Sequence, residues 1–156
     1  MRLYSYMYAR RGAAFGLFCS GWMVVFFSLF AMSARSEEAA AFTIIKPEDI
    51  QWKENKTVPP GMLMFMMSGA PNRPGTFTFR AKIPAGYKLP PHRHPDRRIV
   101  TVLQGTYYSG VGEEFDEAKL IAFPPGSYYT TEPNTPHFAF TGDGEVVIQE
   151  AGEGPS

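Results

Sequence analysis

Residues 86–105 read GYKLPPHRHPDRRIVTVLQG and contain two of the three histidines in the chain. His92 and His94 are two positions apart, a spacing that puts both side chains on one face of a β-strand, about 7 Å apart along the chain. The third histidine, His137, opens another expected strand. Two imidazoles from one strand and a third from a neighbouring strand can bind one metal ion inside a small barrel.

The chain around this stretch has the pattern of an antiparallel β domain. Apolar and polar side chains alternate from Thr76 to Ile83, which is typical of a half-buried strand. Gly, Pro, Asn and Asp separate the other short apolar runs, so the sequence predicts an all-β sandwich or barrel. We also expect one turn at 46–49 and further strands at 42–45, 62–67, 99–103, 106–111, 120–123, 127–130, 137–141 and 145–150.

Residues 1–34 have the order of a secretory signal peptide. Arginines at positions 2, 10 and 11 precede an uncharged apolar run, and small residues follow it. Since about 20 apolar residues can span a bilayer, an uncleaved N-terminal anchor is the alternative. We expect an exported, periplasmic or extracellular protein whose membrane contact is limited to this segment. Residues 35–60 are expected to form a linker and N-terminal extension, and residues 61–156 the folded domain.

The charge of the chain changes once the signal is set aside. The 156 residues carry 15 basic and 15 acidic side chains, and removal of the three signal arginines leaves 12 basic against 15 acidic, a net charge of −3. An acidic domain argues against nucleic acid as a partner. The single cysteine, Cys19, lies in the expected signal, so the domain depends on its apolar core rather than on a disulfide.

The opening stretch resembles the first motif of the cupin superfamily, G-x5-H-x-H-x3-E-x6-G. Gly86, His92, His94 and Gly105 hold every spacing of that motif, and Arg98 stands where the family has Glu. The resemblance implies a single-domain cupin barrel, a double-stranded β-helix of the jelly-roll type. The chain is similar to a group of small exported bacterial cupins of unassigned activity.

A second cupin motif, G-x5-P-x-G-x2-H-x3-N, is present in a weaker form. Gly126 and His137 are in register, whereas Glu132, Asn134 and Thr141 replace the Pro, Gly and Asn. Asparagine tolerates the left-handed backbone that glycine would supply at this point. The two motifs and their strands cover most of residues 77–150.

The resemblance implies that His92, His94 and His137 hold a divalent metal ion, with Fe, Mn, Zn, Ni and Cu all open. One functional interpretation is a metal-dependent oxygenase-type enzyme that acts on a small anionic molecule. The alternative is a non-catalytic cupin that binds or senses a small ligand or metal. Small-molecule ligands are therefore the expected partners. In the resembling group the chain usually continues past the Gly154-Pro155 pair, so we expect that a partner chain could supply a last edge strand and thereby form a homodimer.

Arg98 leaves three interpretations open, because a guanidinium has no acceptor and cannot ligate a cation. Arg98 could face the metal and clamp a substrate carboxylate, in which case Arg98→Glu would raise metal affinity. Asp96 could replace the lost carboxylate ligand, or Arg98 could turn outward to a surface acid. Gln149, on the last expected strand, is a further candidate for lining the pocket.

Other residue groups are expected to serve the core. Each of the tandem tyrosine pairs, 107–108 and 128–129, should place one ring inward and one outward. The methionines at 62, 64, 66 and 67 alternate with apolar residues as in a buried strand. The acidic run 113–117 is expected to be a solvated turn.

Overall fold

The structure is a computed structural model that describes residues 42–156. The expected signal peptide or anchor, 1–34, lies outside the described residues. Within residues 42–156, no helix is long and apolar enough to cross a membrane. Ile45–Ser156 form one compact unit.

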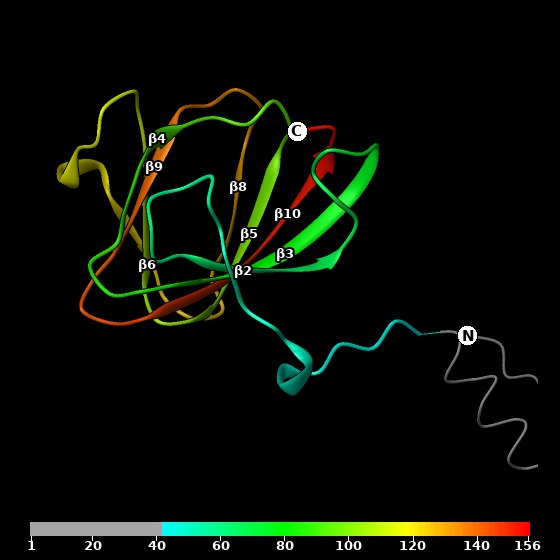
Figure 1. Cartoon of the computed structure of the whole chain (residues 1–156). Helices are drawn as coiled ribbons and strands as arrows, with labels where there is room; N and C mark the ends of the chain where they lie inside the picture. Colours follow the sequence, from blue (N-terminus) through cyan, green and yellow to red (C-terminus); the bar gives the residue numbers. More distant parts are fainter. Residues whose placement is uncertain (1–41) are drawn as a thin grey trace, which may run out of the picture. The chain divides into compact units, whose positions relative to one another are not determined.

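This unit consists of two antiparallel sheets that face each other (Figure 1), and the expected all-β fold is confirmed. The six-stranded sheet has the order β1 (Lys53–Glu54), β2 (Leu63–Ser68), β3 (Gly75–Ile83), β10 (Val146–Gly154), β5 (Arg98–Gln104) and β8 (Tyr128–Thr131). The four-stranded sheet has the order β4 (Lys88–His92), β9 (His137–Thr141), β6 (Tyr107–Val111) and β7 (Ile121–Phe123). Two short 3-10 helices, η1 (Pro47–Asp49) and η2 (Glu117–Lys119), complete the secondary structure.

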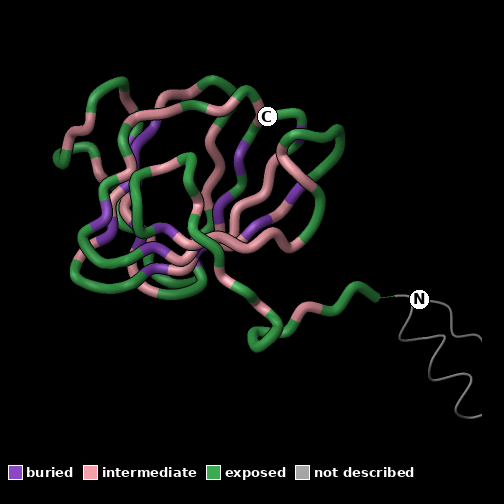
Figure 2. Tube along the Cα trace, in the orientation of Figure 1, coloured by how far each residue is buried: buried purple, intermediate pink, exposed green. Residues whose placement is uncertain are grey.

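Strand β3 forms the centre of the core. Phe77, Phe79, Ala81 and Ile83 are buried, whereas the residues between them are partly exposed, as the period of two predicts. In the neighbouring strand β10, Val146 and Ile148 are buried and alternate with the partly exposed Val147 and Gln149; Figure 2 shows the buried segments in both sheets. Burial of each large apolar side chain of this kind contributes about 1.5–3 kcal/mol.

The structure departs from the expected strands at several places. Residues 42–45 form no strand. The edge of β2 that does not pair with β3 pairs instead with Lys53–Glu54, which form β1. Strand β4 ends at His92, so it is too short to hold both His92 and His94. Pro90 and Pro91 lie within it, and β4 is an edge strand, where proline is tolerated. Strand β10 continues four residues beyond the expected end at Glu150, through two glycines.

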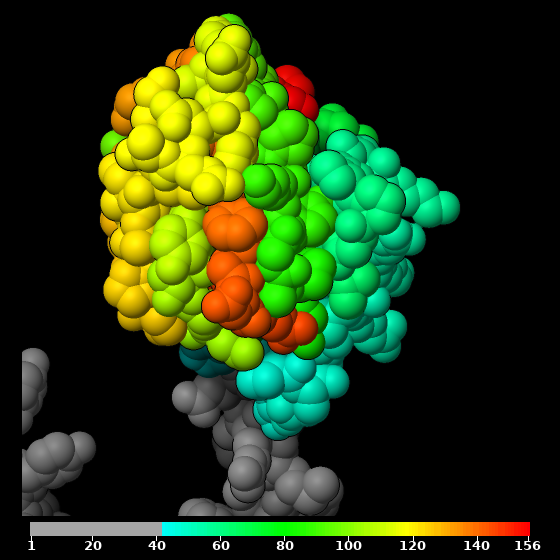
Figure 3. Space-filling view, turned by 90° about the vertical axis from the view of Figure 1, so that its left-hand side faces the viewer, coloured from blue at the N-terminus to red at the C-terminus, as the bar shows by residue number. Residues whose placement is uncertain are grey.

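The acidic run 113–117 lies in a loop in which Glu113, Glu114 and Glu117 are exposed, as expected of a solvated turn, while Phe115 is partly buried. Phe115 lies 5.1 Å from Phe138, ring centroid to ring centroid, and Lys88 bonds Glu117 at 3.2 Å. Asp116 caps η2 by accepting a hydrogen bond from the backbone N–H of Ala118. Figure 3 shows this loop in yellow, beside β9 in orange and β4 in green, on the outer face of the four-stranded sheet.

Candidate functional site

The pairing of β4 with β9 brings two histidines together. These strands are antiparallel, and His92 and His137 are direct partners in their register, after an irregularity between Leu89 and His92. Their ring centroids are 4.3 Å apart. Directly opposed residues on antiparallel strands have Cβ atoms about 4.5–5.5 Å apart, so the ladder itself sets this distance.

His94 reaches the same point from the loop that follows β4. Its ring centroid lies 5.0 Å from that of His92 and 5.3 Å from that of His137. The backbone N–H of Asn134 donates to the carbonyl oxygen of His94 at 2.7 Å, which ties this loop to the start of β9. Asn134 has a φ of 60°, so asparagine does adopt the left-handed backbone expected for it. The expectation that both histidines share one strand was wrong for His94.

Two of the three imidazoles are oriented by backbone carbonyls, and burial favours the uncharged form of all three. Backbone carbonyls of Pro90 and Thr135 lie 2.9 Å from the Nδ1 atoms of His92 and His137, which leaves each Nε2 available as a ligand atom. Burial lowers the pKa of all three histidines, and the nearby Arg98 charge lowers these pKa values further. The pKa of His94 falls to about 3. Neutral imidazole is the form that binds metals.

The spacing of these ligand atoms fits a divalent metal ion. One ligand atom from each histidine lies within 4.8 Å of the others. A tetrahedral ion with metal–nitrogen bonds of about 2.0–2.1 Å spaces its ligands about 3.3 Å apart, so modest side-chain rotation closes the group. No carboxylate belongs to this group among the described residues.

Arg98 does not turn outward to a surface acid, because it pairs with two acids in the interior and borders the cavity that His92 and His94 line. Its side chain is only 8% exposed and lies over the ring of Phe77, at 4.9 Å from the centroid. Nε donates to Asp96 at 3.1 Å, Nη1 donates to Glu150 at 2.8 Å, and Nη2 donates to the Ser156 hydroxyl. These three hydrogen bonds, one from each guanidinium nitrogen, hold the side chain in the interior.

Asp96 serves this cluster rather than the histidines. Besides Arg98, it accepts hydrogen bonds from the Ser156 hydroxyl at 2.6 Å and from the backbone N–H of Glu153 at 2.9 Å. Burial alone would raise its pKa, but these hydrogen bonds and the Arg98 charge hold the pKa below its usual value. The structure therefore places Asp96 in a buried ion cluster with Arg98 and Glu150, outside the histidine group.

The period of two along β10 corrects the expected role of Gln149. Gln149 accepts a hydrogen bond from Arg80 at 3.2 Å and does not line the histidine cavity, whereas its neighbour Glu150 does. Burial raises the pKa of Glu150, while the Arg98 guanidinium acts in the opposite direction. The inward direction of Glu150 could have been predicted from the period of two along the strand, because Glu150 lies two residues after the buried Ile148.

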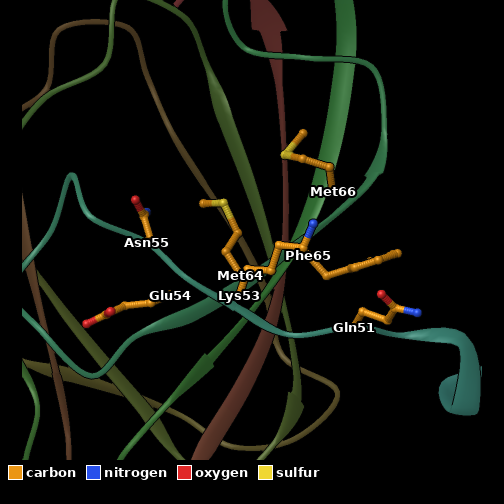
Figure 4. A pocket seen from close by; sticks show the side chains of 7 residues that line it. All are labelled: Gln51, Lys53, Glu54, Asn55, Met64, Phe65 and Met66. Atoms are coloured by element: carbon orange, nitrogen blue, oxygen red, sulfur yellow. The ribbon is translucent and has the colours of Figure 1, made fainter.

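Two cavities lie beside the segment that contains β1 and β2. The inner cavity, of about 200 Å³, is lined by His92, His94, Arg98 and Glu150 together with apolar core residues. An outer groove of about 360 Å³ is lined by Gln51, Lys53, Glu54, Asn55, Met64, Phe65 and Met66. Figure 4 shows Phe65 turned away from Met64 and Met66. Asn55 and Met64 line both spaces and so form the wall between them.

A third cavity, which we call the seam cavity, lies between β7 and β8, the outer strands of the two sheets. It has a volume of about 330 Å³, and His137 is one of its lining residues. The ring of Tyr129 stacks on Phe123 with centroids 4.4 Å apart. Tyr107 and Tyr129 are the inward members of their pairs, whereas Tyr128 is 62% exposed. The expected alternation of the tyrosines is thus confirmed.

Comparison with known proteins identifies the fold. A family model described as "ChrR Cupin-like domain" matches residues 40–152. No curated protein matches the sequence. Among solved structures, KdgF from Halomonas sp. aligns with a TM-score of 0.56 and 18% identity, over 72% of this chain and 94% of that one.

Two further structures agree. The polyketide cyclase RemF from Streptomyces resistomycificus aligns with a TM-score of 0.61 and 14% identity, over 72% of this chain and 79% of that one. An RmlC-like cupin from Shewanella frigidimarina aligns with a TM-score of 0.58 and 13% identity, over 74% and 94%. At these identities the likeness concerns the fold, and the function must be argued from the site itself.

Proposed function

Because this chain belongs to the ChrR cupin-like family, we propose that its barrel binds one divalent metal ion through His92, His94 and His137. The observation that carries this proposal is the meeting of three neutral imidazoles within 4.8 Å, two of them oriented by backbone carbonyls. Imidazole suits Zn, Cu, Fe and Ni, and Mn with added oxygen ligands.

Three protein ligands leave coordination positions for water or a small molecule, and this supports an enzyme rather than a purely structural site. A bound metal would act as a Lewis acid or would activate water or oxygen. The chain itself would supply a cavity lined by apolar core residues and by the Arg98–Glu150 pair, and would hold the imidazoles in their neutral form. We propose a metal-dependent enzyme, of oxygenase type where the metal is iron. The apolar segment 12–33 supports its export to the periplasm or beyond.

A specific observation favours a second candidate, a non-catalytic module that binds or senses a metal or small ligand. The position that would supply an anionic ligand is occupied by Arg98, and the carboxylates beside it are engaged in the ion cluster. Without an anionic ligand, the bound metal keeps its full positive charge, and its affinity depends on the imidazoles alone.

Metal analysis tests the proposal. The purified protein should contain about one equivalent of metal per chain, and the His92→Ala/His94→Ala variant should contain none. Gln149→Ala, on the outer face of β10, is the control and should retain the metal. Absence of metal from the parent protein after incubation with each candidate ion would overturn the metal site.

Turnover separates the two candidates. An iron-loaded oxygenase should consume oxygen when small thiols or diols are added, and the histidine variant should not. A module would bind metal with the same stoichiometry and show no consumption under these conditions. Loss of metal in both variants, including Gln149→Ala, would instead indicate unfolding, which circular dichroism detects.

A further inference from the structure

The histidine group is reached from two sides. His92 and His94 line the inner cavity, whereas His137 lines the seam cavity. The seam cavity has about 330 Å³ and the inner cavity about 200 Å³. Pockets that hold small molecules span about 300–1,000 Å³. Only the seam cavity, of these two, is large enough for that class of ligand.

The seam cavity also opens toward solvent. Val111 on β6 and Ile121 on β7 belong to its lining and are 60% and 62% exposed. Strands β7 and β8 are the outer strands of different sheets, so this side of the barrel is closed by side chains such as Phe123 and Tyr129 rather than by a strand ladder. A molecule can therefore enter here without breaking a sheet.

The lining of the seam cavity is apolar, with hydroxyl groups and no cation. Its described lining contains no Lys or Arg, and its one carboxylate, Glu132, is paired with Arg97 at 3.0 Å. Thr131 and Thr135 have hydroxyls with no hydrogen-bond partner among the described residues. Such hydroxyls can donate to or accept from an alcohol or carbonyl oxygen.

The inner cavity does not supply the missing cation. Arg98 lies there between Asp96 and Glu150, and its three nitrogens already donate to protein acceptors. With both acids ionised, the cluster has a net charge of −1, which disfavours a second anion nearby. In the metal-free protein, an anionic molecule thus meets no unpaired Lys or Arg among the lining residues of either cavity.

We propose that the seam cavity binds an uncharged, largely apolar molecule with a hydroxyl or carbonyl group, which Thr131 and Thr135 orient beside His137. This inference deepens the proposed function, since the bound molecule would face the metal that the three histidines hold. The location of this binding site and its preference for uncharged molecules depend on the protein side chains alone, so both can be measured in the metal-free protein.

The test uses three benzene derivatives of similar size as probes: benzyl alcohol, benzoate and benzylammonium. Saturation-transfer NMR on the metal-free protein should give a dissociation constant on the order of 1 mM for benzyl alcohol, an affinity usual for a ligand of this size. Benzoate should bind at least tenfold more weakly. Equal or tighter binding of benzoate or benzylammonium, or no binding of the alcohol, would overturn the charge preference.

Three variants locate the probe. Ile121→Trp fills the seam cavity and should weaken benzyl alcohol at least fivefold. Val58→Phe fills the inner cavity and should leave binding unchanged. Leu103→Trp is the control for the indole ring of Ile121→Trp, because it adds this ring at an exposed position outside both cavities, and it should also leave binding unchanged. Loss of binding in Val58→Phe with no change in Ile121→Trp would place the probe in the inner cavity and overturn the inference.

Addition of Co²⁺ keeps the two proposals apart. If the histidines bind cobalt and the probe lies beside His137, the proton signals of benzyl alcohol should broaden, and His92→Ala/His94→Ala should abolish the broadening. Cobalt bound without broadening contradicts the seam site but leaves the metal site intact. Probe binding that Ile121→Trp weakens, in a protein that takes up no cobalt, contradicts the metal site and supports the seam site.

Discussion

Arg98 shows how one side chain determines the identity of its neighbours. A buried guanidinium requires acceptors for its donors, and Asp96, Glu150 and Ser156 provide them. The sequence alone gave the position of Arg98 in the motif but not the direction of its side chain. Asp96 is two residues away, whereas Glu150 and Ser156 are 52 and 58 residues away, and such long-range pairings depend on the sheet register rather than on local pattern.

Replacement of Arg98 by glutamate should destabilise the protein rather than improve the metal site. Arg98→Glu would bury three carboxylates in one cluster, and removal of one partner of a buried ion pair costs about 3–5 kcal/mol. Urea unfolding measures this loss. Arg97→Glu is the matched control, because Arg97 lies in an exposed pair with Glu132 and should change stability by less than about 1 kcal/mol. A stable Arg98→Glu protein with raised metal affinity would contradict the buried cluster.

Gly152 makes room for the same cluster. A Cβ atom built there would lie 2.3 Å from Asp96 Oδ2 and 2.7 Å from Phe77 Cζ. Gly152→Ala should therefore lower the free energy of unfolding by about 1–3 kcal/mol, as overpacking does. Gly144→Ala is the control, since nothing lies within 4 Å of a Cβ at that position. Similar thermal midpoints for the two variants would contradict this account.

At the scale of elements, the two sheets determine which residues meet. The alternation in β3 is strong enough to predict both the strand and its buried face. The β4–β9 pairing is harder to predict, because two prolines lie in β4 and its register contains an irregularity. The motif spacing therefore identified three candidate histidines, and only the ladder showed why His92 and His137 are direct partners.

The turn before β9 positions His94, and Asn134 is its key residue. A φ of 60° is readily adopted by asparagine or glycine, so Asn134→Gly should be close to neutral, whereas Asn134→Ala should cost about 1 kcal/mol. Because the Asn134 N–H holds the His94 carbonyl, Asn134→Ala should also weaken zinc binding, which calorimetry measures. Weaker zinc binding in Asn134→Gly than in Asn134→Ala would show that the asparagine side chain, not the backbone, is what matters.

The whole molecule should be sensitive to pH in its metal-free form. The pKa of His94 is about 3 in the folded protein, whereas unfolded histidine titrates near 6.5. Between pH 3 and pH 6.5 the unfolded chain binds a proton at His94 more readily than the folded protein does. The free energy of unfolding is therefore highest above pH 6.5 and falls as the pH drops toward 3. Because His94 is partly exposed, we expect its protonation to lower the free energy of unfolding by about 1 kcal/mol between pH 7.5 and pH 5.

Urea unfolding of the EDTA-treated protein at the two pH values checks this expectation. His94→Asn should show a smaller loss between pH 7.5 and pH 5, because asparagine does not titrate. Saturating zinc at pH 7.5 should raise stability by about 2.7 kcal/mol at a free concentration 100 times the dissociation constant. An identical pH dependence in the parent and His94→Asn would show that His94 is not shielded from protons.

The buried cluster of Arg98, Asp96 and Glu150 also constrains how this sequence can diverge. Arginine without its two acids leaves an uncompensated internal charge, and acids placed beside a glutamate at 98 repel one another. Both combinations destabilise the fold, so evolution through either one is disfavoured. We therefore expect positions 96, 98 and 150 to change together among homologues. We also expect glycine at position 152 wherever position 98 is arginine. We expect the residue at position 98 to divide homologous sequences into two groups, and the residue at position 150 to show to which group a new sequence belongs.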